Sequence, residues 1–240
     1  MATDNSTPVA AFAPATFIPG DPTCAVVVPP SAHTLDGFRK WALSEEFPER
    51  GKMTFVGGEL IIDMSPEYFE THNFIKTEIT SVIYGRTKAR AMGRVYSDRA
   101  LFSNEAAGVS TEPDAMFAAK ESLRTERCKV VRASRPGIGE ELVGSPDWVL
   151  EILSSSSRRK DTTLLREAYF RAGIPEYWIV DALGDDVELQ ILVAGEGGYV
   201  ATTDQQGWLA SPAFACSFRL TRKKDDVGYW MYTLQVQESA

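Results

Sequence analysis

The sequence has few of the residues that form disulfide frameworks or common metal and nucleophile sites. Its 240 residues include three cysteines, Cys24, Cys128 and Cys216, no CxxC pair and two histidines. This argues against a disulfide scaffold and a structural zinc site, and a reducing cytoplasm is the simplest setting. The sequence also lacks a Gly-x-Ser-x-Gly elbow, a Walker-type loop and a GxGxxG motif. Serine hydrolases, P-loop proteins and dinucleotide-binding proteins therefore have no support, and we expect no organic cofactor.

Basic charge and long apolar runs are also scarce. The chain carries 25 Lys and Arg residues against 33 Asp and Glu, a formal net charge of -8. This argues against a broadly basic, non-specific nucleic-acid binder, although a local basic groove is compatible with it. Residues 1–32 are rich in Pro and Ala, contain no Lys or Arg, and lack an apolar run that could form a signal sequence or a membrane span. We therefore expect a flexible tail over 1–32, a single domain over 33–240 and no membrane association.

The rest of the chain mixes helical and strand patterns. Apolar spacing predicts a short helix that begins near Thr34 and ends before residue 48, two β runs over 52–66 joined at a Gly-Gly turn, and a helix over 67–91. Short β runs follow at 94–103 and 114–119. The stretch 145–181 then has a strand, helix, strand pattern, which usually joins parallel strands, so the centre of the protein is predicted to be α/β. Alternating runs after residue 186 predict added β-structure.

Glu151 is unusual because it lies within an apolar strand, over residues 147–153, where alternation places it between apolar neighbours. A buried carboxylate requires a cation, a metal, several hydrogen-bond donors or a raised pKa. The simpler alternatives are a strand end open to water or a salt bridge to one of the bases that follow it: Arg158, Arg159 and Lys160.

Asp114 is a second acidic residue at the mouth of an apolar strand, directly after a proline. Alone it is typical of a turn. At the ends of adjacent strands, however, Asp114 and Glu151 would repel each other unless a divalent metal lay between them, and such oxygen ligands suit Mg²⁺ or Mn²⁺. This is the constellation needed to polarise a phosphate and activate water for phosphodiester cleavage.

The motifs GELIIDMSP, PDAMFA and SPDWVLEILSSSSRRKD, followed by LLREAYFRAGIPEYWIVD, occur in this order. Their succession resembles the Uma-two family of bacterial restriction-endonuclease-like proteins, a branch of the PD-(D/E)XK nuclease superfamily. The resemblance covers roughly residues 34–220. It implies an α/β restriction-endonuclease-like core with a mixed central sheet, flanking helices and added β-hairpins, together with Mg²⁺-dependent cleavage of DNA and frequent homodimers.

The resemblance also implies site residues. Asp114 matches the PD aspartate and Glu151 the (D/E) position, and both would be metal ligands. Glu59 matches the family's GE motif and could join the metal, or could simply face solvent. His72 matches the histidine at the helix start and could line the cleft, with a capping or surface position as the alternative.

The lysine of the superfamily is absent from both expected places. Leu153 stands two residues after Glu151, and Leu165 stands four residues after Asp161, which opens the next helix. The adjacent bases are Lys160 and Arg166. We favour Lys160 as the residue that replaces the catalytic lysine, because it lies in the loop that leaves the Glu151 strand. The alternative is that Lys160 is simply a solvated loop residue.

Two hypotheses follow. The first is a Mg²⁺-dependent deoxyribonuclease that uses Asp114, Glu151 and Lys160. The second is a catalytically impaired nuclease-fold protein that acts as a dimeric binding or assembly module, which the two leucines favour. A small-molecule binding protein would need an apolar pocket unrelated to the acids, of which the sequence gives no sign.

Overall fold

The computed structural model describes residues 26–132, 140–203 and 205–238. Its α-helices are α1 (Leu35–Ala42), α2 (Phe74–Ala89), α3 (Lys120–Arg124) and α4 (Arg166–Arg171). Wider π-type turns precede two of them: η2 (Phe69–Asn73) leads into α2, and η3 (Lys160–Leu165) leads into α4. Two short 3-10 turns complete the helical structure: η1 (Pro30–His33) and η4 (Pro212–Phe214).

A first six-stranded sheet is formed mainly by the N-terminal half of the described chain. Its order is β2 (Glu59–Asp63), β1 (Lys52–Val56), β5 (Val109–Thr111), β4 (Leu101–Asn104), β8 (Glu140–Gly144) and β7 (Cys128–Arg132). The β4–β8 pair is parallel and the other pairs are antiparallel. The hairpin β1–β2 turns at Gly57 and Gly58, whose φ angles of 60° and 84° are the left-handed values that a two-residue turn requires.

A second six-stranded sheet, the central sheet, has the order β12 (Tyr199–Ala201), β11 (Glu188–Ala194), β10 (Glu176–Asp181), β9 (Trp148–Ile152), β6 (Ala115–Ala119) and β3 (Gly93–Ser97). Only its β9–β10 pair is parallel, and α4 joins these two strands. The strand, helix, strand prediction is therefore confirmed. A three-stranded sheet of β13 (Leu209–Ser211), β14 (Cys216–Lys224) and β15 (Trp230–Glu238) follows.

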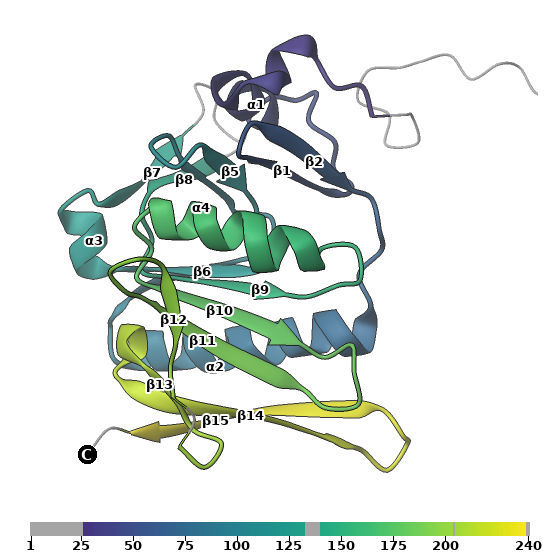
Figure 1. Ribbon diagram of the computed structural model, residues 1–240, viewed down its shortest axis with the longest axis vertical. Coiled ribbons are helices and arrows are strands. Elements are labelled where there is room, and N and C mark those ends of the chain that lie inside the picture. Colours follow the sequence, from purple (N-terminus) through teal and green to yellow (C-terminus); the bar gives the residue numbers. More distant parts are fainter. Residues whose placement is uncertain (1–25, 133–139, 204, 239–240) are drawn as a thin grey trace, which may run out of the picture.

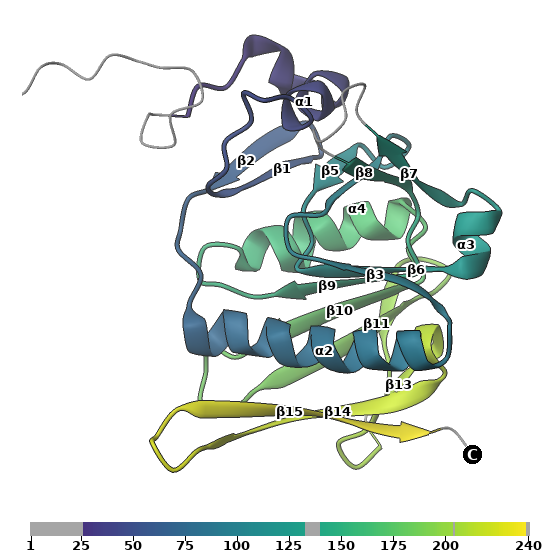
Figure 2. The ribbon, with the colours of Figure 1, turned by 180° about the vertical axis from the view of Figure 1, so that it is seen from behind.

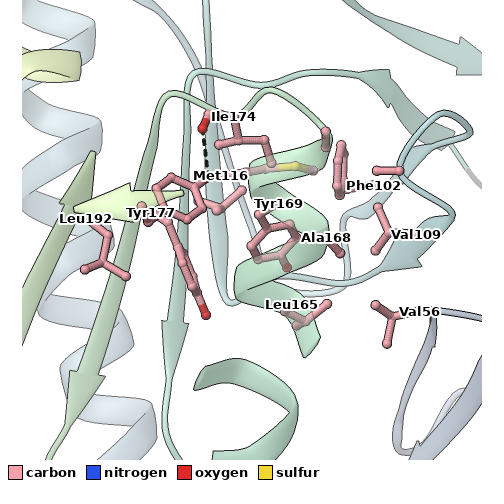
Figure 3. Close-up of a cluster of buried hydrophobic side chains, with 14 of the residues drawn as sticks. Val56, Phe102, Val109, Met116, Leu165, Ala168, Tyr169, Ile174, Tyr177 and Leu192 are labelled. Carbon is pink, nitrogen blue, oxygen red and sulfur yellow. Dashed lines mark hydrogen bonds between the residues drawn. The ribbon is translucent and has the colours of Figure 1, made fainter. Parts of the chain in front are cut away.

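These elements stack in layers. Helix α4 lies between the first sheet and the central sheet, whereas α2 covers the opposite face of the central sheet beside the β14–β15 hairpin (Figures 1 and 2). One core surrounds α4 and includes Phe102, Tyr169 and Tyr177 (Figure 3). The other core joins Ile79 of α2 to Trp148 of β9 and to the third sheet. A mixed sheet flanked by helices and extended by hairpins confirms the predicted fold class.

Alternation along β9 and β10 is also confirmed by the two cores. Trp148 and Trp178 belong to the core under α2, whereas Val149 and Tyr177 belong to the core under α4. Glu151 has the same phase as Val149 and so points toward the α4 side.

One local prediction needs correction. The β run expected over 94–103 is two strands in different sheets, because Asp98 and Arg99 take left-handed φ angles of 45° and 57° that break it. The predicted first helix is confirmed, because α1 begins after its N-cap Thr34 and ends at Ala42, before residue 48.

The predicted flexible tail over 1–32 falls mostly outside the described residues, since 1–25 are not described. Val26 and Val28 nonetheless pack against the small core around Phe38, and Ala32 is buried. A flexible tail over 1–32 and a single domain over the remainder both stay proposals. Among the described residues, no helix combines the length and the apolar character needed to cross a membrane.

Candidate metal centre

A polar cavity opens where the β1–β2 hairpin meets the end of β9 and the start of η3. Its volume is about 460 Å³. These elements come together at the right-hand side of Figure 1, where the chain leaves β2 for α2. Eight acidic residues line the cavity: Glu49, Asp63, Glu67, Asp98, Glu112, Asp114, Glu151 and Asp161. Four Lys and Arg residues face them: Arg50, Lys52, Arg99 and Lys160. The excess of carboxylates favours a cation as the occupant.

Asp114 lies immediately before β6, at the floor of this cavity, and is 1% exposed. Its backbone N–H donates to the carbonyl oxygen of Leu150 over 3.1 Å, and its Oδ2 accepts a 2.7 Å hydrogen bond from the backbone N–H of Ile152. The two β9 residues that hold Asp114 thus flank Glu151. The structure brings the two sequence-predicted carboxylates to neighbouring positions in one cavity.

Lys52 and His72 lie against the carboxylate of Asp114. Lys52 Nζ contacts Oδ1, and His72 Nε2 lies 3.4 Å from Oδ2. Burial alone would raise the pKa of Asp114, but the charges and hydrogen bonds of Lys52 and His72 outweigh it and hold the pKa well below its ordinary value. Asp114 is therefore ionised in the folded protein at neutral pH.

Glu151 has a different environment, although it is only 2% exposed. Its Oε1 accepts a 2.7 Å hydrogen bond from the hydroxyl of Tyr169, and no salt bridge to it occurs among the described residues. The bases expected as partners contact other acids, since Arg158 pairs with Asp181 and Lys160 with Asp161. Burial is the main reason that the pKa of Glu151 rises to about 8. The charge of Lys160 opposes this rise, and the carboxylates of Asp161 and Asp114 add to it.

Lys160 and Asp161 also line the cavity, and Lys160 Nζ contacts Asp161 Oδ1. Asp161 is buried at the start of the helix that follows β9. Lys160 lies in the first turn of this helix, not in a preceding loop, which corrects the sequence-based placement. The desolvation of Asp161 raises its pKa, and the charge of Lys160 opposes that rise.

A second group of potential ligands shares Asp114. Glu67, His72 and Asp114 each offer a ligand atom, and these atoms all lie within 4.8 Å of one another. His72 is buried and lines the cavity. Among the described residues its Nδ1 has no hydrogen-bond partner, although it lies 3.7 Å from Glu67 Oε2. Glu67, however, already accepts a 2.7 Å hydrogen bond from Lys76. The carboxylates of this set suit Mg²⁺, and the set that includes the imidazole suits Mn²⁺.

Two sequence-predicted site residues do not reach the cavity. Glu59 is exposed at the turn end of β2, paired with Val56, whereas the cavity is lined by Asp63 at the opposite end of that strand. Arg166 directs its Nη2 to the carbonyl oxygen of Tyr199 over 3.0 Å and is not among the lining residues. The register of β2 places Glu59 away from the cavity, and the helix face on which Arg166 lies points away from it.

The leucines at the expected lysine positions belong to the apolar core. Leu153 is 3% exposed and Leu165 is fully buried, and both belong to the cluster around α4 that includes Tyr169 (Figure 3). Their packing explains why neither position carries a charge.

Sequence reasoning missed Lys52, Asp63 and Glu67. Lys52 is the first residue of a predicted strand and has the same phase as Thr54, which also lines the cavity. That phase is a local signal that Lys52 shares a face with Thr54, but nothing local indicates that this face meets Asp114.

The comparisons with known proteins agree on a nuclease-like family and fold. A family model named Uma2, described as "Putative restriction endonuclease", matches residues 35–223. A solved structure described as "a putative nuclease belonging to DUF820 from Anabaena variabilis ATCC 29413" is 21% identical, with a TM-score of 0.56 over 76% of this chain and 90% of that chain. No curated protein matches the sequence. At this identity, the structural likeness establishes the fold.

Proposed function

This chain belongs to the Uma2 family, and from that premise we propose that it is a metal-dependent nuclease that hydrolyses phosphodiester bonds of DNA. Asp114 and Glu151 would hold a Mg²⁺ or Mn²⁺ ion between them. The chemistry that such an ion supplies is polarisation of the phosphate and activation of water. The residues of the chain would bind the ion, exclude bulk water and place positive side chains near the substrate.

The environment of Glu151 carries this proposal. Glu151 is a buried carboxylate that lines the cavity, and among the described residues it has one hydroxyl donor and no salt bridge. Its charge is therefore unfavourable unless a cation binds. Asp114 lies beside it and is already ionised. Together the two carboxylates form a site whose negative charge a divalent ion can compensate and a neutral ligand cannot.

The surrounding bases suit a phosphate-bearing substrate. Arg50, Arg99 and Lys160 line the same cavity, so an anionic group could approach the carboxylates once their charge is compensated. Lys160 is the catalytic lysine predicted from the sequence, and this role stays a proposal. DNA as the substrate and a homodimer as the active form rest on the family alone.

The test is cleavage of supercoiled plasmid DNA with Mg²⁺ or Mn²⁺. We expect Asp114→Asn and Glu151→Gln each to reduce the rate by at least about a hundredfold, in the range of losses seen when charge-stabilising groups are removed. Glu59→Gln, a change at an exposed carboxylate outside the cavity, is the matched control and should retain activity. Equal activity in all four proteins would refute the proposed site.

The competing ligand set is separated by the same assay combined with Mn²⁺ titration. If Glu67 and His72 complete the site, Glu67→Gln weakens Mn²⁺ binding and Glu151→Gln does not. If Asp114 and Glu151 hold the ion, Glu151→Gln weakens Mn²⁺ binding and Glu67→Gln does not.

The second candidate function is a nuclease-fold binding module without activity. The apolar burial of Leu153 and Leu165 favours it, because no lysine can replace them without disrupting the core. It predicts DNA binding by the wild type with no divalent-ion-dependent cleavage.

A further inference from the structure

The cavity contains a lysine at a position where a metal ion would bind. Lys52 extends from the start of β1, and its Nζ contacts Oδ1 of Asp114 and lies 3.9 Å from Oε1 of Glu67. The side chain is 30% exposed and lines the cavity, so Lys52 is not sealed in the core. Lys52 is therefore held by charge, at a place that solvent and ions can reach.

The two oxygens of Asp114 have different partners. Oδ2 accepts the N–H of Ile152 and faces His72, which fixes the carboxylate on β9. Oδ1 accepts a hydrogen bond from Lys52 Nζ. Oδ1 is thus the oxygen through which Asp114 would bind a divalent cation, and Lys52 contacts this oxygen.

The other cations of this region contact different acids. Lys160 contacts Asp161, and Lys76 contacts Glu67 and Asp98, at 2.7 and 3.0 Å. In the described part of the chain, neither Lys160 nor Lys76 contacts Asp114. The positive charge on Asp114 Oδ1 therefore comes from Lys52 alone among these lysines.

We propose that Lys52 is a tethered counter-ion of Asp114, which a divalent cation must displace in order to bind. An ammonium and a divalent ion repel strongly at contact distance in a partly desolvated site, so both cannot use the same oxygen. The four-carbon stem of lysine lets the ammonium swing within the cavity while β1 stays in place.

This inference rests on the metal site of the proposed function and deepens it. The displaced ammonium stays tethered to the cavity wall, where it faces an incoming phosphate. Lys52 would then be the catalytic lysine that positions 153 and 165 do not supply, in preference to Lys160, which is bound to Asp161. Its charge on the phosphate would stabilise the negative charge that develops during cleavage.

The first experiment measures Mn²⁺ affinity by calorimetry for the wild type, Lys52→Met and Lys160→Met. Removing a competing charge should tighten Mn²⁺ binding to Lys52→Met by about tenfold, and Lys160→Met should change it by less than about threefold. Unchanged or weaker binding to Lys52→Met would overturn the inference, as would an equal gain in Lys160→Met.

The second experiment uses the wild type, so that it does not depend on the folding of a variant. Lysine acetylation by acetic anhydride is followed by peptide mass spectrometry with and without Mn²⁺. We expect the modification of Lys52 to increase severalfold when Mn²⁺ is bound, because the ammonium leaves its carboxylate. No change at Lys52, with Lys160 as the internal reference, contradicts the inference.

Cleavage assays at saturating Mn²⁺ separate the two proposals. Lys52→Met should lose at least about tenfold in rate although it binds the metal more tightly, a pair of opposite effects that a structural role would not produce. Displacement of Lys52 without wild-type cleavage leaves the counter-ion role intact and refutes the nuclease. Full cleavage by Lys52→Met refutes its catalytic role and leaves the nuclease intact.

Discussion

Asp114 and Glu151 are two buried carboxylates whose environments shift their pKa values in opposite directions. Asp114 has Lys52, His72 and a backbone N–H as partners, which lower its pKa despite burial. Glu151 has the hydroxyl of Tyr169 and a pKa raised to about 8. In the metal-free protein at neutral pH, one carboxyl is charged and the other largely protonated. A carboxyl that can change its protonation state near neutrality beside a fixed charge is a common arrangement in active sites.

The raised pKa of Glu151 predicts a specific pH dependence of stability. The folded state keeps its proton up to about pH 8, whereas an ordinary glutamate loses it near 4.5. Between these values the unfolded state binds fewer protons, so the free energy of unfolding falls as pH rises, by up to about 1.4 kcal/mol per pH unit. The contribution of protonated Glu151 to the free energy of unfolding is complete below pH 4.5 and is lost above pH 8.

Urea unfolding in a chelator at pH 5, 6, 7 and 8 tests this for the wild type and Glu151→Gln. The glutamine keeps a carbonyl oxygen for Tyr169 but cannot ionise, so the variant should gain stability relative to the wild type as pH rises. Parallel curves for the two proteins would show that Glu151 does not titrate in this range.

At the scale of elements, the site depends on how one hairpin and one helix meet the central sheet. The β1–β2 hairpin carries Lys52 and Asp63 to the cavity from its open end, with the glycine turn at the far end. The helix after β9 places Asp161 at its start, on the cavity, and Leu165 one turn later, in the core. The same helix therefore serves the site with its first turn and the core with its next.

This division predicts that lysine cannot be restored at position 165. Leu165 is fully buried among apolar side chains, so Leu165→Lys would place an ammonium there without a partner. We expect a loss of about 3–5 kcal/mol in the free energy of unfolding and no gain in cleavage. Leu165→Met is the matched control and should cost less than about 1.5 kcal/mol. Wild-type stability of Leu165→Lys, measured by urea unfolding, would mean that this helix face is open to the cavity.

At the scale of the whole molecule, charge predicts that the proposed binding of DNA depends on divalent ions. The formal net charge is -8, and eight acidic residues face four Lys and Arg residues in the cavity. A polyanion is repelled by such a surface until bound cations reverse the local charge. The negative balance is thus compatible with a nuclease only if the metal contributes to binding as well as to chemistry.

We therefore expect a phosphorothioate-linked DNA duplex, which resists cleavage, to bind about tenfold or more tightly in millimolar Mg²⁺ than in a chelator at matched ionic strength. Fluorescence anisotropy measures the affinity. The double variant Asp114→Asn, Glu151→Gln should lose most of the Mg²⁺ effect, and an equal effect in both proteins would place the ion elsewhere.

Local patterns were sufficient for much of the fold. The glycine turn of the hairpin, the apolar stripe of α2 and the strict alternation around Glu151 each involve residues close in the chain, whose periodicity reports directly on secondary structure and burial. The order of the motifs then identified the family. Where left-handed residues such as Asp98 and Arg99 interrupt a β run, the pattern was not sufficient, because a backbone angle at one residue redirects the chain without a change in hydrophobicity.

The sequence by itself predicted the fold class and pointed to Asp114 and Glu151 as candidate ligands, because an acidic residue within or at the mouth of an apolar strand is visible in the local sequence alone. Only the tertiary structure decided which side chains join them. Lys52 is 62 residues from Asp114 in the chain, yet it contacts it, whereas Glu59 in the same hairpin is turned away. Strand register and the stacking of α4 between two sheets set these distances, and they depend on contacts between segments that no local periodicity records.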